Sequence, residues 1–171
     1  MNKIAKFEKV SYEQFAQDWK KTQYNYRDDE IKDIYDKIVL PKRSTIGSAG
    51  YDFYLPDSIG LSESDYVLIP TGIRCEINDG WMLSLFPRSG HGFKYGIHLA
   101  NTVGVIDADY AFADNEGHIM VKLVNDSVLR QDINFSRHTA FCQGIFIPFG
   151  ITVDDESEGV RRGGFGSTDN K

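Results

Sequence analysis

The chain has 171 residues, enough for one domain with a substantial core, and its 41% hydrophobic and 26% charged content is that of an ordinary soluble globular protein. Its formal net charge of -6 argues against stable binding to duplex nucleic acid, which depends on clustered basic side chains. The first residues, MNKIAKFEKVSYEQF, carry too many charges for a secretory signal, and no apolar run has the length of a membrane span. We therefore expect a cytoplasmic protein that binds no membrane.

The N-terminal region predicts two helices. Ser11 followed by Gln14 is typical of a capping box, and Phe15 and Trp19 then lie four residues apart on one helical face. The next stretch, RDDEIKDIYDKI, begins with acidic residues and ends before a proline. Its apolar stripe comprises Ile31, Ile34, Tyr35 and Ile38. We expect residues 1–36 to form a helical extension whose aromatic side chains serve a core or an interface rather than a ligand site.

From residue 37 onward the sequence changes to short β-rich runs separated by turn signals: YVLIPTGIRCEI, WMLSLFP, GIHLANTVGVI, HIMVKLVN and FCQGIFIPFGI. In HIMVKLVN, Ile119, Val121 and Leu123 alternate with His118, Met120 and Lys122, which is the period of a half-buried strand. Many short strands without βαβ alternation predict an all-β jelly roll or barrel over residues 37–153. Residues 154–171 are poor in apolar side chains and are expected to form a flexible tail.

The cysteines and histidines predict no redox or zinc chemistry. Cys75 and Cys142 are far apart in apolar, strand-like surroundings, so both are expected to be reduced thiols. The four histidines, at positions 91, 98, 118 and 138, have no spacing typical of zinc ligands.

Three polar stretches between the strands could carry chemistry. In PRSGHGFKYG, Arg88 and three glycines in a turn could hold phosphate oxygens, although a β-turn with a surface arginine fits equally well. In SAGYDFYLP, Asp52 could hold magnesium through water or simply initiate a turn. In NTVGVIDADYAFADNEGH, a carboxylate at a strand end could activate water beside the stacking ring of Tyr110, or the stretch could be a solvated acidic turn. A calcium loop is excluded there, because Phe112 and His118 occupy the sixth and twelfth positions.

In chain order, the stretches GSAGYDF, PRSGHGFKYGI, NTVGVIDADY, CQGIFIP and RGGFGST resemble the five motifs of the trimeric deoxyuridine triphosphatases, the dUTPases. The resemblance runs from about Leu40 to the C-terminus, and the ordered set is far more specific than any one motif. It implies a jelly-roll protomer, a homotrimer with active sites shared between subunits, and magnesium-dependent hydrolysis of dUTP to dUMP and pyrophosphate.

The resemblance also implies roles for single residues. Asp107 is similar to the family's catalytic base, which activates the water that attacks the α-phosphorus, and Tyr110 to the tyrosine that packs on the deoxyribose and excludes a 2′-hydroxyl. The predicted uracil-binding residues are Asn101, Gly104, Val105, Ile106 and Met120. The predicted phosphate-binding residues are Arg88, Ser89, Gly90 and Gln143, with Asp52 linked to magnesium through water.

The C-terminal RGGFGST resembles the family's mobile fifth motif, which closes over bound substrate. Phe165 would stack on uracil, and an arginine with Ser167 and Thr168 would bind the γ-phosphate. Val160 stands where the family usually has this arginine, so we favour Arg162 over the preceding Arg161.

Two further departures concern the core motifs. Ala140 replaces the usual arginine of the fourth motif, and Arg137 is the candidate substitute. The stretch AFADNEG after Tyr110 is longer than the family's usual turn and could reshape the edge of the pocket or a subunit contact.

Two other functions stay open. A dCTP deaminase shares the fold, but that activity needs a glutamate at the base, which the stretch from Asn101 to Gly104 lacks. A nucleotide-responsive regulator could instead bind a protein partner through residues 1–36.

Overall fold

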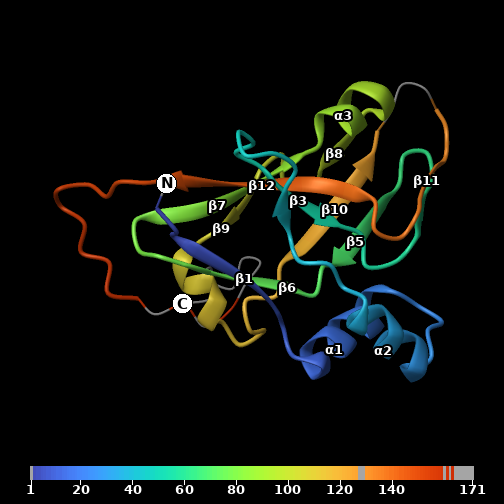
Figure 1. Cartoon of the computed structure of the whole chain (residues 1–171), viewed down its shortest axis with the longest axis horizontal. Helices are drawn as coiled ribbons and strands as arrows, with labels where there is room; N and C mark the ends of the chain where they lie inside the picture. Colours follow the sequence, from blue (N-terminus) through green and yellow to red (C-terminus); the bar gives the residue numbers. More distant parts are fainter. Residues whose placement is uncertain (1, 127–129, 160, 162, 164–171) are drawn as a thin grey trace.

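Short antiparallel strands are the main regular elements of this computed structural model, which describes residues 2–126, 130–159, 161 and 163 (Figure 1). The largest sheet has the order β2-β3-β12-β7-β9 and contains β2 (Lys42–Arg43), β3 (Tyr51–Tyr54), β12 (Ala140–Pro148), β7 (Trp81–Pro87) and β9 (Gly104–Ile106). A second sheet has the order β5-β10-β8, with β5 (Tyr66–Pro70), β10 (Met120–Asn125) and β8 (Ile97–Leu99). Two further pairs of strands complete the β structure: β1 (Ala5–Lys9) with β6 (Ile73–Ile77), and β4 (Ile59–Leu61) with β11 (Ile133–Phe135). The predicted all-β, jelly-roll-like architecture is confirmed.

Both predicted N-terminal helices are present, as α1 (Tyr12–Thr22) and α2 (Asp28–Asp36). Their apolar stripes join the hydrophobic core of the sheets, where Phe15, Trp19, Ile31 and Ile34 are all buried. The two helices lie together at one edge of the β structure, where α1 packs beside β5 (Figure 1). The apolar stripes in the sequence therefore predicted correctly which face of each helix is buried.

The predicted capping box at the start of α1 is only half formed. Ser11 Oγ accepts a hydrogen bond from the backbone N–H of Gln14 at 3.1 Å, as an N-cap should. The return bond is absent because the backbone N–H of Ser11 donates instead to Glu116 at 2.7 Å. Gln14 donates to Asp18 at 2.7 Å. A carboxylate 105 residues away thus completes the cap.

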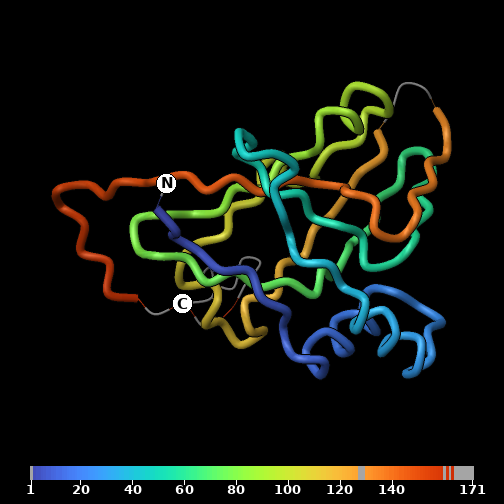
Figure 2. Tube along the Cα trace, viewed as in Figure 1, coloured from blue at the N-terminus to red at the C-terminus, as the bar shows by residue number. Residues whose placement is uncertain are grey.

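The purely helical character predicted for residues 1–36 is wrong at its beginning, because Ala5–Lys9 forms strand β1 along β6. Figure 2 shows this blue N-terminal segment running beside the green trace of β6. Phe7 anchors the strand by packing on the rings of Tyr51, Phe53 and Phe146 at centroid distances of 5.4, 5.6 and 5.7 Å. A single aromatic among charged neighbours gave too weak a local pattern to predict a strand.

The glycine-rich stretch after β7 is a short helix rather than the predicted turn. Helix α3 spans Ser89–Tyr95, with Arg88 at its N-cap position. It ends at Gly96, whose φ of 68° lies in the left-handed region that glycine tolerates at a helix C-terminus.

The alternation predicted for residues 118–123 holds within β10 and fails just before it. Ile119, Val121 and Leu123 are buried as expected. His118 is also fully buried, at 0% exposure, although the pattern placed it with the more exposed Met120 and Lys122. It precedes the strand, and polar groups surround its ring: Gly72 N–H donates to Nε2 at 2.8 Å, while Nδ1 lies 2.7 Å from Asp18. Because Nε2 accepts, Nδ1 carries the proton and donates to Asp18.

Replacing Asp18 by Ala is expected to lower the free energy of unfolding at pH 7 by about 2 kcal/mol, because it leaves the buried Nδ1–H of His118 without an acceptor. Burial opposes ionisation of Asp18, but hydrogen bonds from His118 and Gln14 outweigh it and lower its pKa. A lowered pKa stabilises the folded state above the unfolded value of about 3.9, and this stabilisation is lost as pH falls through the folded value. Urea unfolding of both proteins at pH 7 and pH 3 should show the difference shrinking at pH 3. An equal difference in the free energy of unfolding at pH 7 and at pH 3 would contradict this prediction.

Both cysteines are free and buried, as predicted. Burial raises the pKa of the Cys75 thiol to about 12 and also raises the pKa of Cys142, so neither forms a thiolate near neutral pH. In the part of the chain that the structure describes, no helix has the length and apolar character needed to cross a membrane.

Candidate active site

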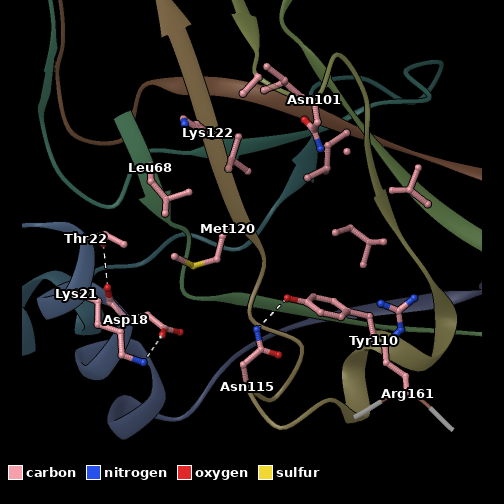
Figure 3. Close-up of a pocket in the computed structure, with 17 residues that line it drawn as sticks. Asp18, Lys21, Thr22, Leu68, Asn101, Tyr110, Asn115, Met120, Lys122 and Arg161 are labelled. Carbon is pink, nitrogen blue, oxygen red and sulfur yellow. Dashed lines mark hydrogen bonds and ion pairs between the residues drawn. The ribbon is translucent and has the colours of Figure 1, made fainter. Parts of the chain in front are cut away.

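A cavity of about 720 Å³ opens between α1, β10 and the loop that joins β8 to β9 (Figure 3). It is lined by six of the residues predicted to bind the nucleoside: Asn101, Gly104, Val105, Ile106, Tyr110 and Met120. The structure therefore gathers residues that span positions 101 to 120 around one space.

A tight turn shapes the wall that carries Asn101. Thr102 has a φ of 63° and donates its backbone N–H to Leu99 O at 3.0 Å, which reverses the chain directly after β8. Gly104 then enters β9 opposite Leu85, where an added Cβ would meet the Leu85 Cβ at 3.2 Å. Glycine lets the two strands approach closely, and the side chain of Asn101 is left exposed at the mouth of the cavity.

Asp107 lies where β9 ends and the 3-10 helix η1 (Ala108–Phe112) begins. Its backbone carbonyl accepts from Tyr110 N at 3.1 Å, and three residues per turn bring Asp107 and Tyr110 to the same side of this helix. The side chain of Asp107 is 46% exposed and does not cap η1. Its carboxylate is therefore partly open to solvent. Asp107 does not itself line the cavity, but its neighbour Ile106 and its partner Arg161 do.

Arg161 contacts this edge of the site. Its guanidinium hydrogen-bonds Asp107, binds Asp109 at 2.9 Å and lies 5.7 Å from the centroid of the Tyr110 ring. Arg161, which we did not favour from the sequence, therefore contacts Asp107, the predicted base. The other predicted tail residues, Arg162, Phe165, Ser167 and Thr168, lie outside the described residues.

The ring of Tyr110 is held by its hydroxyl group. Tyr110 is buried, its Oη donates to His118 O at 2.9 Å, and Asn115 Nδ2 donates to the same Oη at 2.9 Å (Figure 3). Burial raises the pKa of Tyr110, so the phenol stays protonated and presents a neutral ring to the cavity.

A second group of predicted residues meets at the opposite end of the large sheet. Asp52 and Gln143 face each other across β3 and β12, and Arg88 Nε lies 3.3 Å from Asp52 Oδ1. Ser44 Oγ donates to Asp52 Oδ2 at 2.9 Å. Gln143 donates to the carbonyl of Pro87 at 3.2 Å, which holds it against the segment that carries Arg88. Ser89 and Gly90 begin α3 beside this group.

The two groups lie far apart within one chain. Strand β7 connects them: Leu83 pairs with Ile106 near Asp107, whereas Pro87, adjacent to Arg88, pairs with Cys142. Leu83 and Pro87 are four residues apart, which is roughly 13 Å at about 3.3 Å per residue, and Asp107 and Arg88 each lie one residue beyond these pairs. In Figure 1, α3 and the short yellow helix η1 lie on opposite sides of the molecule. One subunit therefore does not place Arg88 beside Asp107.

Arg137, considered as a substitute for the missing fourth-motif arginine, does not join the second group. It donates to Pro56 O at 2.8 Å and to Asp33 at 3.2 Å, which ties the β11–β12 loop to α2. The guanidinium of Arg137 thus attaches the β11–β12 loop to the N-terminal helix α2.

The sequence did not predict that α1 would line the cavity. Asp18, Lys21 and Thr22, spaced three and four residues apart on one helical face, form its far wall, and Asn115 joins them from the loop after η1 (Figure 3). None belongs to a motif, and the polar face of α1 was the only available signal.

Comparison with known proteins shows which family this chain belongs to. The dUTPase family model matches residues 36–169. The deoxyuridine 5′-triphosphate nucleotidohydrolase of Lactococcus lactis is 38% identical over 134 residues, which cover 77% of this chain and 88% of that protein. The crystal structure of dUTPase from Streptococcus mutans is 33% identical with a TM-score of 0.63, and the match covers 85% of this chain and 97% of that one. The dUTPase of Staphylococcus aureus phage phi11, 16% identical with a TM-score of 0.61 over 92% and 98% of the two chains, shares the fold. The chain belongs to the dUTPase family.

Proposed function

We propose that this protein hydrolyses dUTP to dUMP and pyrophosphate at sites that two subunits of a homotrimer build together. The observation that carries the proposal is the separation of two chemically complementary groups in one chain. One group, around Asp107 and Tyr110, suits a nucleoside and its α-phosphate, and the other, around Arg88, suits the remaining phosphates. A cyclic oligomer can bring the first group of one subunit to the second group of its neighbour.

Asp107 is the proposed general base. Its exposed carboxylate at the edge of the cavity is acceptor-only when ionised, so it can take the proton of a water that attacks the α-phosphorus. The new P–O bond forms as the bond from the α-phosphorus to the bridging oxygen breaks, and pyrophosphate leaves with that electron pair. The pairing of Asp107 with Arg161 holds the carboxylate in place until substrate arrives.

The wall around Asn101 is proposed to select uracil. The side-chain amide of Asn101 and the backbone groups of residues 104–106 can pair with the polar edge of a pyrimidine ring. A site built for such hydrogen bonds leaves groups unpaired when the base carries a different donor and acceptor pattern. The ring of Tyr110 would then pack on the sugar of the bound nucleotide.

The second group is proposed to bind the β- and γ-phosphates. Arg88 offers forked N–H donors to phosphate oxygens, and Gln143 adds an amide donor. The backbone N–H groups of Ser89 and Gly90, in the first turn of α3, have no carbonyl partner within the helix and can donate to the same anion.

Magnesium fits this group as an ion carried by the substrate. Among the described residues no three metal-ligand side chains cluster, and Asp52 is a single carboxylate already paired with Arg88. Magnesium commonly keeps its waters and binds phosphates with one or two carboxylates, so Asp52 would hold the ion through water. The ion would supply charge neutralisation on the phosphate oxygens.

Residues 154–171 are proposed to form a lid over the bound substrate.

Pyrophosphate release with magnesium from dUTP, dCTP, dTTP and UTP in parallel tests the function. We expect release from dUTP, with dCTP at least about 10²-fold slower, because cytosine presents a different donor and acceptor pattern to the site. Thymine shares the pattern of uracil, so dTTP should be slowed by the bulk of its 5-methyl group, and UTP by contact of its 2′-hydroxyl with the ring of Tyr110. Comparable release from all four would contradict the proposed uracil site. Absence of release from dUTP would contradict the hydrolase itself.

A further inference from the structure

We propose that Asn115 is a positioning residue that fixes the ring of Tyr110 and thereby sharpens discrimination between deoxyribose and ribose substrates. The inference rests on the proposed function and adds to it a residue from the stretch AFADNEG, which lies beyond the family motifs. Asn115 acts through Tyr110 and needs no contact with the substrate.

Hydrogen bonds at the distal end of the ring set its orientation. Tyr110 Oη donates to His118 O at 2.9 Å and accepts from Asn115 Nδ2 at 2.9 Å, so the donor and one acceptor site of the hydroxyl are both used. The other end of the ring is fixed by its backbone in η1. A ring fixed at both ends keeps one face at a constant distance from the cavity.

The carbonyl that receives the tyrosine is itself held in place. The ring of His118 accepts from Gly72 N–H through one nitrogen and contacts Asp18 of α1 through the other, at 2.8 and 2.7 Å. With both ring nitrogens engaged in the buried interior, the backbone of His118 has little freedom to move.

The loop that carries Asn115 is fastened on both sides. Glu116 accepts from the backbone N–H and the hydroxyl of Ser11 at 2.7 and 2.6 Å, which attaches the loop to the start of α1. Gly117, at a φ of 70°, lies so close to η1 that an added Cβ would be 2.6 Å from the Ala111 Cα. Asn115 therefore donates to Tyr110 from a rigid support.

The two ends of the Asn115 amide have separable roles. Oδ1 accepts from Gly117 N–H at 3.2 Å and shapes the loop, whereas Nδ2 donates to Tyr110 Oη at 2.9 Å and to His118 O at 3.4 Å. An aspartate at this position keeps the acceptor for Gly117 but has no donor, so the Tyr110 hydroxyl could bond to it only by leaving His118 O. Asn115→Asp thus keeps the loop contact and disrupts the present pair of hydrogen bonds at the hydroxyl of Tyr110.

The test compares kcat/KM for dUTP and for UTP in the wild type, Asn115→Asp, Tyr110→Phe and the double variant. We expect Asn115→Asp to lower the dUTP-to-UTP ratio by about three- to tenfold, the worth of one hydrogen bond. In the Tyr110→Phe background, which has no hydroxyl to receive the bond, Asn115→Asp should change the ratio no further. A purely structural role would lower the melting temperature and leave the ratio unchanged.

An unchanged ratio in a folded Asn115→Asp variant, or an equal change in the Tyr110→Phe background, would overturn the inference. If Asn115→Asp folds poorly, Tyr110→Phe alone, which leaves Asn115 bonded to Gly117 and removes both hydrogen bonds of the hydroxyl, should lower the ratio by at least this factor. An unaltered ratio there would also overturn the inference. Binding of non-hydrolysable dUTP and UTP analogues gives the same ratio without turnover. A protein that binds and discriminates but releases no pyrophosphate would refute the proposed function alone.

Discussion

Replacing Asp107 by Asn is expected to reduce the kcat for dUTP by roughly 10²- to 10⁴-fold, the range associated with loss of a general base. Asparagine has nearly the same shape but cannot accept a proton from the attacking water. The affinity for a non-hydrolysable dUTP analogue should change little, because Asn101, Tyr110 and Arg88 still provide the contacts proposed for base, sugar and phosphate. Steady-state pyrophosphate release and equilibrium titration with the analogue would measure the two quantities separately.

Asp109 provides the matched control for this experiment. It lies two residues further along, is exposed, and also binds Arg161 at 2.9 Å. Asp109→Asn removes one carboxylate from the same arginine without touching the proposed base. If both variants lost activity equally, the effect would belong to the arginine contact, and Asp107 would no longer be the base.

Local patterns in the sequence predicted the elements that bury a regular apolar face. Helix α1 was predicted from the spacing of Phe15 and Trp19, and β10 from the alternation of Ile119, Val121 and Leu123, because burial on one side imposes these periods directly on the sequence. Strand β1 was missed because its pairing with β6 is a long-range contact, and its two apolar residues, Ala5 and Phe7, are only partly buried.

The site was predicted where a motif gathers its residues within a short stretch. Residues 101 to 110 form one tight turn, the short strand β9 and one helical turn, so their proximity was implied by their order along the chain. The contributions of Asp18, Lys21 and Asn115 depend on how α1 docks against the loop after η1, through bonds between residues about 100 positions apart. No local pattern encodes such a contact.

The N-terminal segment lies outside the family match in the sequence but packs within the same core in the structure. Residues 1–35 precede the region that matches the family model, which begins at residue 36. In space, Phe15 and Ile31 belong to the same hydrophobic core as the strands, and Ser11 and Asp18 bind the loop that follows the predicted base. The extension is therefore an integral part of one side of the cavity.

Mixing two inactive variants should restore activity if two subunits share each site. Asp107→Asn damages the nucleoside group and Arg88→Ala the phosphate group, and the structure separates these groups within a chain. In randomly mixed oligomers, about one quarter of shared sites would combine an intact first group with an intact second group from a neighbour. Sites contained in one chain would always carry one defect, so their mixture would stay inactive.

A control pair distinguishes sharing from partial recovery by other means. Asp107→Asn mixed with Tyr110→Ala places both defects in the same group, so no shared site can obtain an intact first group and activity should stay at the level of the separate variants. Chains carrying two different affinity tags, co-expressed and purified through both, would guarantee that mixed oligomers are assayed. Each mixed trimer purified in this way has one intact shared site among three, so recovery near one third of wild-type turnover in the first pair and none in the second would establish that Asp107 and Arg88 act from different subunits. Recovery in neither pair would place the whole reaction within one chain, and residues other than Arg88 would then have to bind the phosphates beside Asp107.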